Sequence, residues 1–357
     1  MNKATRYTTG PYQLSLDITN RCNLRCLHCY NSSGENCVMN NELSDKEVRK
    51  FVDSLLPMKL LNLCFCGGET LLRKELIYEC VRILSNGGIR TALVSNGTLA
   101  TEEVIHNLYV AGLKSIQFSI DGCCEETHDR LRNKKGVFEK VIKALNIVRN
   151  YDMEISISFA PTSFNVNELE MLHAYLESLS YENKAELRLQ PLMPLGRGNK
   201  NKNDICPSEE QYRKLVNTVG KINQRNPKIR VVWGDPIDHL IRFPYLDDLP
   251  MYYISIRSNG DIVVSPYLPL VVGNIRKHDF VEYWNNGLKS IWKNKIPRYM
   301  ASFIRSIDDM ATLNKKLPET FMNDIYIDML EEDLDNIDIL KNKLKVHQLK
   351  MDIPLKL

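Results

Sequence analysis

The chain has 357 residues, of which 43% are hydrophobic and 25% are charged, and this composition excludes a protein that is disordered throughout. Lys and Arg number 47 against 44 for Asp and Glu, so the formal net charge of +3 provides no basic field for nucleic acid or an anionic membrane. The first ten residues are polar, and no apolar run reaches 18 residues. The sequence therefore predicts a cytoplasmic protein without a signal peptide or membrane span.

Short strand-like and helix-like runs alternate between residue 13 and about residue 190. The predicted strands are Gln13–Thr19, Leu61–Cys66, Arg90–Ser95, Ser115–Asp121, Glu154–Ala160 and Glu186–Gln190. Between them, apolar residues recur at helical spacing, which predicts repeated βα units around a parallel sheet. Six such units in series predict an α/β fold, a partial (β/α)6 TIM-like barrel.

Several predicted strands alternate between apolar and polar residues. Ile116 and Phe118 share one face of the fourth strand, whereas Gln117, Ser119 and Asp121 share the other. If helices cover the apolar faces, the polar faces line an open interior that holds a polar ligand. An antiparallel sheet with one solvated face is the alternative, which the intervening helices disfavour.

Beyond the barrel the pattern changes after Gly196-Arg197-Gly198. The sequence predicts a connector helix, two hairpin strands and the turn between those strands: Pro207–Ile222, Ile254–Arg257, Asp261–Val264 and Ser258–Gly260. From Tyr283 onward it predicts mainly helix. We therefore expect a barrel over 1–198, a connector with a helix over 199–250, and a hairpin with C-terminal helices over 251–357.

The chain has ten cysteines, nine of them before residue 125. Without a signal peptide, they indicate reduced thiols or metal ligands rather than a disulfide framework. Cys22, Cys26 and Cys29 follow the first predicted strand in one short loop. Three thiolates with this spacing can hold three irons of a cubane cluster and leave the fourth iron open. A zinc site with His28 as fourth ligand is the alternative, disfavoured because His28 adjoins Cys29 and lies two residues from Cys26.

This Cys-x3-Cys-x2-Cys loop resembles the cluster loop of the radical S-adenosylmethionine (SAM) enzymes. Gly67-Gly68-Glu69-Thr70 is similar to the family's glycine-glycine-glutamate motif, although the family usually has proline at the position of Thr70. Ser95-Asn96-Gly97 and Ser119-Ile120-Asp121 end two strands where the family contacts SAM. The stretch His128–Arg132 resembles one in the peptide-modifying branch of the family.

The resemblance implies one [4Fe–4S] cluster on Cys22, Cys26 and Cys29, with SAM on the open iron. It implies SAM contacts from these residues: His28, Tyr30, Gly67, Gly68, Glu69, Thr70, Ser95, Asn96, Ser119, Asp121 and Arg132. Within this set, the Glu69 carboxylate is expected to accept from the methionine ammonium. The implied chemistry is reductive cleavage of SAM to a 5′-deoxyadenosyl radical, which removes a hydrogen atom from the substrate.

The segments Gly260–Tyr267 and Val272–Ile275 resemble the SPASM or twitch extension of this family, in which cysteines bind auxiliary clusters. Here Tyr267 follows Pro266 where the family has a cysteine, and Cys206 is the only thiol beyond residue 124. We therefore expect a twitch-like hairpin and helical extension without a second cluster. The alternative is an unrelated hairpin and helix cap. Without a second cluster to accept an electron, a redox-neutral outcome such as epimerisation is favoured.

The resemblance is nearest to enzymes that mature ribosomally made peptides, so a peptide is the expected substrate. A sugar, nucleoside or other small metabolite is the first alternative, and a non-enzymatic iron–sulfur protein for electron transfer or sensing is the second. About 12 residues precede the first strand, so we expect a separate leader-peptide-binding protein rather than a fused module. A reductant such as flavodoxin or ferredoxin is the other expected partner. Cys66 and Cys206 are hypothesised donors of a hydrogen atom to the substrate radical.

Overall fold

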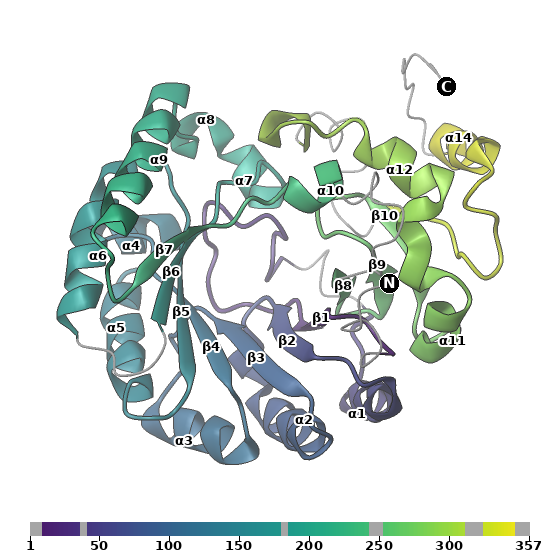
Figure 1. Ribbon diagram of the computed structural model, residues 1–357, viewed down its shortest axis with the longest axis horizontal. Coiled ribbons are helices and arrows are strands. Elements are labelled where there is room, and N and C mark those ends of the chain that lie inside the picture. The colour runs from purple at the N-terminus through teal and green to yellow at the C-terminus, as the bar shows by residue number, and fades with distance from the viewer. Residues whose placement is uncertain (1–8, 36–40, 180–184, 243–252, 311–323, 347–357) are drawn as a thin grey trace.

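The computed structural model describes residues 9–35, 41–179, 185–242, 253–310 and 324–346, and Figure 1 shows the arrangement of their helices and strands. Eleven strands form one sheet in the order β11-β10-β9-β8-β1-β2-β3-β4-β5-β6-β7. The sheet is curved (Figure 1), and it stays open because β7 and β11 lie at opposite ends of this order. The predicted α/β fold with a partial TIM-like barrel is therefore confirmed.

Seven strands from β1 to β7 pair in parallel and form the curved part of the sheet. They are β1 (Gln13–Thr19), β2 (Asn62–Gly67), β3 (Arg90–Ser95), β4 (Ser115–Ser119), β5 (Glu154–Phe159), β6 (Ala185–Leu189) and β7 (Arg230–Trp233). The first six agree with the predicted strands to within two residues at each end. The seventh was not predicted, because β7 is only four residues long and carries too short a pattern.

Helices cover the outer face of the curved sheet (Figure 1). They are α1 (Asp45–Leu55), α2 (Lys74–Asn86), α3 (Glu102–Ala111), α4 (Glu125–Arg132), α5 (Val137–Val148), α6 (Leu169–Ser178) and α9 (Glu209–Gln224). Helix α1 begins with a capping box, in which the Ser44 and Glu47 side chains satisfy each other's backbone N–H groups. Its buried residues Val48, Phe51 and Val52 share one helix face. Such apolar faces pack on the buried side of the strands and leave the polar side of the strands inward.

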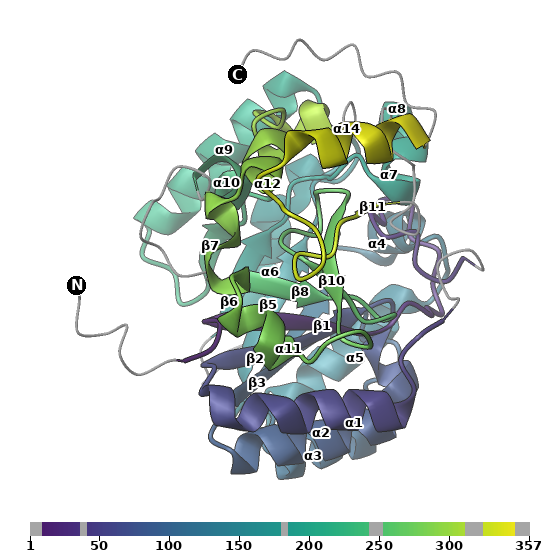
Figure 2. The same cartoon turned by 90° about the vertical axis from the view of Figure 1, so that its right-hand side faces the viewer.

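The C-terminal part extends the same sheet beyond β1. It contains β8 (Tyr253–Ile256), β9 (Asp261–Val263), β10 (Leu270–Asn274), β11 (Ile325–Tyr326), α11 (Phe280–Asn285), α12 (Lys295–Ala301) and α14 (Ile337–Val346). Strand β8 pairs in parallel with β1, and β9 runs antiparallel to β8, which confirms the predicted hairpin. At the turn, Gly260 has φ +91°, a conformation that favours glycine. Figure 2 shows β8 beside β1.

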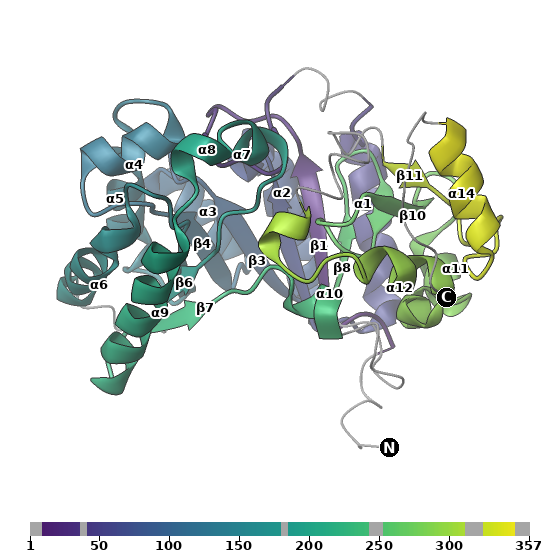
Figure 3. The same cartoon turned by 90° about the horizontal axis from the view of Figure 1, so that it is seen from above.

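In Figure 3, α6 and α9 lie at one end of the molecule, and α12 and α14 lie at the other. Between the parts, the predicted connector contributes α9 and β7, so one sheet runs through all three predicted segments. The division at residues 198 and 250 stays a prediction, and the stretches 1–8, 36–40, 180–184, 243–252, 311–323 and 347–357 of the predicted segments lie outside the described residues. Among the helices that the structure describes, none is long and apolar enough to cross a membrane.

Candidate active site

Three cysteines meet in the loop that follows β1. Cys22, Cys26 and Cys29 all contact one small apolar cluster that contains Leu24 and Val137. Their three Sγ atoms do not all lie within 4.8 Å of one another. In a tetrahedral zinc site, with zinc–sulfur bonds of about 2.3 Å, thiolates lie about 3.8 Å apart. A cubane cluster places each thiolate on a separate iron and needs a wider spacing. The three thiols therefore fit a [4Fe–4S] cluster better than a single zinc ion.

Two glycines bring the end of β2 against the start of this loop. Gly67 has φ +127°, and a Cβ atom on it would lie 2.2 Å from the Thr19 carbonyl oxygen. A Cβ atom on Gly68 would lie 2.2 Å from the Arg21 carbonyl oxygen. The backbone N–H groups of Gly68 and Glu69 donate to those same carbonyls at 2.7 and 2.8 Å. Only glycine allows this approach, so the motif fixes the position of the cysteine loop.

Glu69 lies beneath the loop and is fully buried. Its carboxylate accepts from the Leu71 N–H at 3.1 Å, the Ser95 hydroxyl at 2.8 Å and the Asn96 N–H at 2.8 Å. Burial raises the pKa of Glu69, and these donors oppose the rise. A carboxylate offers about four acceptor positions, so one stays available to a further donor such as an ammonium group. The structure thus brings together three residues that the sequence assigned to SAM binding.

Two neighbours of this carboxylate contact protein rather than open space. The Thr70 hydroxyl is buried and donates to the Val94 carbonyl at 2.8 Å. The Asn96 side chain donates to the Asn23 side chain at 2.9 Å and thereby ties the end of β3 to the cysteine loop. Thr70 and Asn96 therefore connect the strands and the cysteine loop around the site.

A buried ion pair lies on the other side of the cysteine loop. Asp121, just after β4, pairs with Arg132 at the end of α4, and both side chains are at most 8% exposed. The Arg132 guanidinium also lies 3.7 Å from the Cys26 sulfur. Burial alone would raise the pKa of Asp121, but Arg132 and other neighbours hold it below its usual range. Arg132 therefore carries its charge next to both a carboxylate and a cysteine of the loop.

His128 supports this ion pair from below. It is fully buried, and its Nδ1 accepts from the Asp121 N–H at 3.0 Å. Burial lowers the pKa of His128 to about 4, so the ring is neutral at physiological pH. The ring therefore serves as a neutral acceptor at Nδ1, whereas its buried Nε2 has no hydrogen-bond partner among the described residues.

The segment that follows β6 and contains the short helix α7 covers the cysteine loop, and this contact was not predicted from the sequence. Arg197, in α7 (Gly196–Lys200), is buried and donates to the Cys26 carbonyl at 3.0 Å and the Ser33 carbonyl at 3.1 Å. It also pairs with Glu35 at 2.9 Å. Gly196 has φ +52°, and a Cβ atom there would lie 2.4 Å from the Tyr30 carbonyl oxygen. The signal in the sequence was an arginine between two glycines just after the last predicted strand.

A cavity of about 490 Å³ fills the interior of the barrel beside the cysteine loop. Polar residues of the strands line it, namely Gln13, Ser15, Gln117, Ser119, Ser158 and Arg188. The predicted polar interior is therefore confirmed. The C-terminal part contributes a second wall with Tyr253, Tyr267 and the preceding His239, which no motif in the sequence indicated. Burial lowers the pKa of His239 to about 4, and its Nε2 lies 2.8 Å from the Ser265 hydroxyl.

The predicted SAM contacts fall into two groups around this cavity. Those that line it are His28, Tyr30, Gly67, Ser119, Asp121 and Arg132. Those outside its lining are Gly68, Glu69, Thr70, Ser95 and Asn96, which form the packed layer next to it. The Nδ1 atom of His28 is buried and has no hydrogen-bond partner among the described residues, so it is free to bind a group in the cavity.

The two hypothesised hydrogen donors are in different places. Cys66 lines the cavity together with Cys64, and their sulfur atoms lie 3.4 Å apart. The hydrogen bond with Cys64, together with burial, raises the pKa of Cys66 well above its usual value, so the thiol keeps its proton. Cys206 is exposed just after α8 (Lys202–Ile205) and does not line the cavity. The structure therefore brings only Cys66 to the site.

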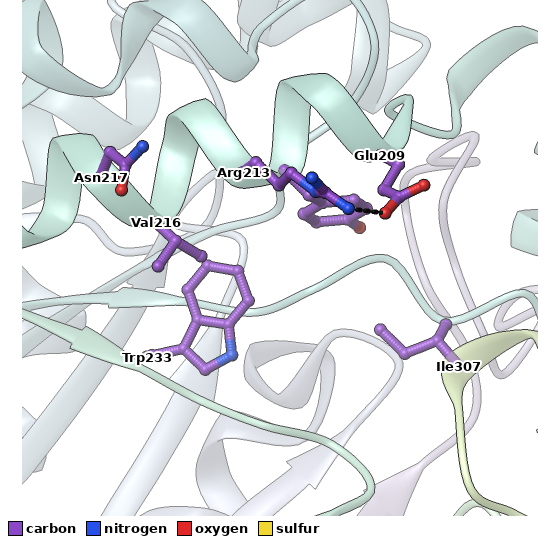
Figure 4. Close-up of a pocket in the computed structure, with 7 residues that line it drawn as sticks. Glu209, Arg213, Val216, Asn217, Trp233 and Ile307 are labelled. Carbon is purple, nitrogen blue, oxygen red and sulfur yellow. Dashed lines mark hydrogen bonds and ion pairs between the residues drawn. The ribbon is translucent and has the colours of Figure 1, made fainter.

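A separate groove of about 580 Å³ lies on the outside of the barrel, between α9 and β7 (Figure 4). Trp233 and Val216 form its apolar part, and an ion pair between Arg213 and Glu209 borders it. The exposed edge of β7 is partly closed, because the Asn223 amide bonds both the N–H and the carbonyl of Val231. None of the predicted site residues lines this groove.

Comparison with known proteins identifies the domain. Residues 16–176 match the family model described as the Radical SAM superfamily. The chain carries a radical SAM domain. This domain binds a [4Fe–4S] cluster and SAM, and the chain is accordingly an enzyme that cleaves SAM. When bound, the cluster and SAM supply a carbon-centred radical that can attack an unreactive C–H bond.

Two curated relatives of this chain are informative. The mycofactocin maturase MftC of Mycolicibacterium smegmatis is 31% identical over 65% of this chain and 56% of its own length. The AdoMet-dependent heme synthase of Methanosarcina barkeri is 26% identical over 78% of this chain and 83% of its own length. The chain thus spans little more than half of MftC but most of the heme synthase.

Solved structures share the fold. Streptococcus suis SuiB bound to S-adenosylmethionine superposes with a TM-score of 0.63 at 15% identity, covering 79% of this chain and 68% of SuiB. The anSMEcpe structure with bound AdoMet has a TM-score of 0.60 at 17% identity and covers 95% of this chain and 98% of its own. The likeness to anSMEcpe extends through the C-terminal part that completes the cavity.

Proposed function

We propose that this radical SAM enzyme removes a hydrogen atom from a ribosomally made peptide in the cytoplasm and returns one, so that the reaction is redox-neutral. The observation that carries the proposal is the barrel cavity with a protonated cysteine thiol, Cys66, in its wall. Two of the similar proteins support a peptide substrate: MftC is a maturase, and SuiB has been solved bound to its precursor peptide SuiA.

In this proposal different residues around the cavity bind the cluster and the separate groups of SAM. Cys22, Cys26 and Cys29 hold the cluster, and the free acceptor position of Glu69 takes the methionine ammonium of SAM. Arg132 and Asp121 line the cavity next to Glu69, where a guanidinium suits the methionine carboxylate and a carboxylate suits ribose hydroxyls. Thr70, Ser95 and Asn96 shape the site through side-chain hydrogen bonds, and Gly67 and Gly68 shape it through the backbone.

A redox-neutral outcome is supported by the C-terminal part of the cavity. Among residues 253–310 and 324–346 there is no cysteine, and Tyr267 and Tyr253 form the wall there. A substrate radical therefore has a thiol within the cavity but no described thiolate set for a second cluster. Cys66 is the proposed donor, because an S–H bond is weak enough to be given to a carbon radical. The thiyl radical left on Cys66 then takes one electron from the external reductant and one proton from water, which restores the thiol. The reductant and the separate leader-binding partner stay predictions.

The test is anaerobic turnover in deuterium oxide, with SAM, dithionite and the short peptides encoded beside the gene. We expect one peptide to gain a single deuterium, seen as a mass increase of about 1 Da, together with 5′-deoxyadenosine. Cys66→Ala should continue to form 5′-deoxyadenosine but no deuterated product, whereas Cys206→Ala should behave as the wild type. Deuterated product from Cys66→Ala would contradict the proposed donor.

A small carboxylate-bearing metabolite is a second candidate substrate. The observation that favours it is Arg188, which lines the cavity and has no ion pair within the described residues. The similarity to the heme synthase, which covers most of that protein, points in the same direction. Turnover with a porphyrin carboxylate and not with any peptide would favour this candidate. Arg188→Gln should then raise KM while leaving SAM cleavage in the absence of substrate unchanged.

A further inference from the structure

Two cysteines and a glutamate meet at the rim of the barrel, outside the active-site cavity. Cys123 and Cys124 follow β4, and Glu168 ends a short 3₁₀ helix, η5 (Val166–Glu168). One carboxylate oxygen and the two sulfur atoms all lie within 4.8 Å of one another. Cys124 is exposed and Cys123 is half-buried, so an ion from solvent can reach the cluster. We propose that Cys123, Cys124 and Glu168 bind one Zn²⁺ ion, with water as fourth ligand.

The carboxylate is already held in place for this role. Its Oε2 atom accepts from the Cys123 N–H at 2.8 Å, and its Oε1 atom accepts from the Thr127 hydroxyl at 2.6 Å. The same hydroxyl lies 3.4 Å from the Cys124 sulfur. Each carboxylate oxygen has a second lone pair for a metal. Outer hydrogen bonds of this kind orient the ligands of metal sites and are worth tenfold or more in affinity.

The donor set decides which ion fits. Two thiolates with one carboxylate suit Zn²⁺, whereas Mg²⁺ and Ca²⁺ select oxygen ligands. Binding must release two thiol protons, which leaves a site charge of minus one from two thiolates, one carboxylate and the ion. Because binding displaces these two protons, zinc affinity should rise with pH.

The site joins two loops that shape the SAM pocket. The Asn165 side chain already links them, because it donates to the Asp121 carbonyl at 2.8 Å and to the Ala160 carbonyl at 2.9 Å. An ion between Cys123 and Glu168 would fasten the same two loops a second time, two residues beyond Asp121. It would restrict the motion of the Asp121 backbone without touching the cavity. This inference does not depend on the identity of the substrate.

Zinc analysis of the reconstituted holoenzyme tests the site, because occupied cluster cysteines cannot then bind zinc. After dialysis against limiting Zn²⁺, we expect about one zinc per chain in the wild type and in the Cys206→Ser control, which replaces another exposed thiol. Cys124→Ser and Glu168→Gln should lose it. Thr127→Val, which removes only the outer hydrogen bonds, should weaken binding about 10- to 100-fold.

A second measurement guards against variants that fold poorly. Zinc should raise the melting temperature of the wild type and of Cys206→Ser, and leave that of Glu168→Gln unchanged, although this variant keeps both cysteines. Equal zinc contents in the wild type, Cys124→Ser and Glu168→Gln would overturn the proposal. So would a Cys123–Cys124 disulfide in peptides from protein purified without oxygen, since an oxidised pair offers no thiolate.

Discussion

Replacement of Glu69 separates its two roles, support of the loop and binding of SAM. Glu69→Ala removes the acceptor of three buried donors. The Ser95 hydroxyl can rotate, but the backbone N–H groups of Leu71 and Asn96 cannot. An unsatisfied buried donor costs about 1–3 kcal/mol, so two cost about 2–6 kcal/mol. The alanine also removes a carboxylate whose ionisation burial disfavours, which offsets part of this cost. We therefore expect the free energy of unfolding to fall by about 2–4 kcal/mol.

Glu69→Gln tests the SAM role with less damage. Oxygen Oε1 serves Leu71 and Ser95 and Oε2 serves only Asn96, so the amide should turn its NH₂ group toward Asn96. One buried hydrogen bond is lost, at a cost of about 1–3 kcal/mol. The amide also lacks the charge that attracts an ammonium, so SAM affinity should fall about tenfold or more.

Urea unfolding under anaerobic conditions measures the first effect, and equilibrium dialysis of SAM against the iron-loaded enzyme measures the second. The matched control is Glu79→Gln, the same chemical change at a half-exposed glutamate of α2 that pairs with Arg49. Iron content should be unchanged in both glutamine variants. If Glu69→Ala is as stable as the wild type, or if Glu69→Gln binds SAM with unchanged affinity, the assigned roles are wrong.

Three further predictions concern the cluster loop, the arginine that covers it and an aspartate of β1. Reconstitution should give about four irons per chain, and replacing all three loop cysteines by alanine should abolish binding, whereas about eight irons would reveal a second cluster. Arg197→Ala leaves two buried carbonyls without their donor, so the free energy of unfolding should fall by about 2–4 kcal/mol and the cluster should have a shorter lifetime. Lys200→Ala is the control and should change neither, because the contact between Lys200 and Glu35 is 3.8 Å long and exposed. Asp17 has a pKa raised by burial from 3.8 to about 6, so ionisation destabilises the folded state above that pH by about 3 kcal/mol. Asp17→Asn should therefore be more stable than the wild type at pH 8 and equally stable near pH 4, and equal stability at both would contradict the assignment.

Much of the barrel could be predicted because the local alternation of apolar and polar residues also decides which side chains face the helices and which face the cavity. Strand β4 alternates apolar and polar residues, so the same periodicity that indicates a strand also tells which side chains face the cavity. Strand β7 was missed because four residues carry too little pattern, and only pairing with β6 defines it. The same is true of β11, whose two residues pair with β10, 55 residues (325 − 270) earlier in the chain.

For the site, the sequence indicated which residues belong to it, but it did not show which distant segments contact them. The cysteine spacing and the glycine pair are local signals, and both lie in the site. Arg197 reaches Cys26 only because the chain returns over the loop 171 residues later, and no local pattern reports this return. The wall of Tyr253 and Tyr267 likewise depends on β8 joining β1. Cys206 could not be placed, since its position depends on where α8 ends.

The pairing of β8 with β1 has a consequence during synthesis of the protein. Gln13 pairs with Tyr253, and 240 residues (253 − 13) separate them. At about 5–20 residues per second, a ribosome needs roughly 12 to 48 s to make that stretch. For this time β1 has emerged with one edge lacking its partner, next to a loop of three free thiols. An edge in this state attracts other strands. The nascent chain therefore depends on protection of its N-terminal region until nearly three quarters of it has been made.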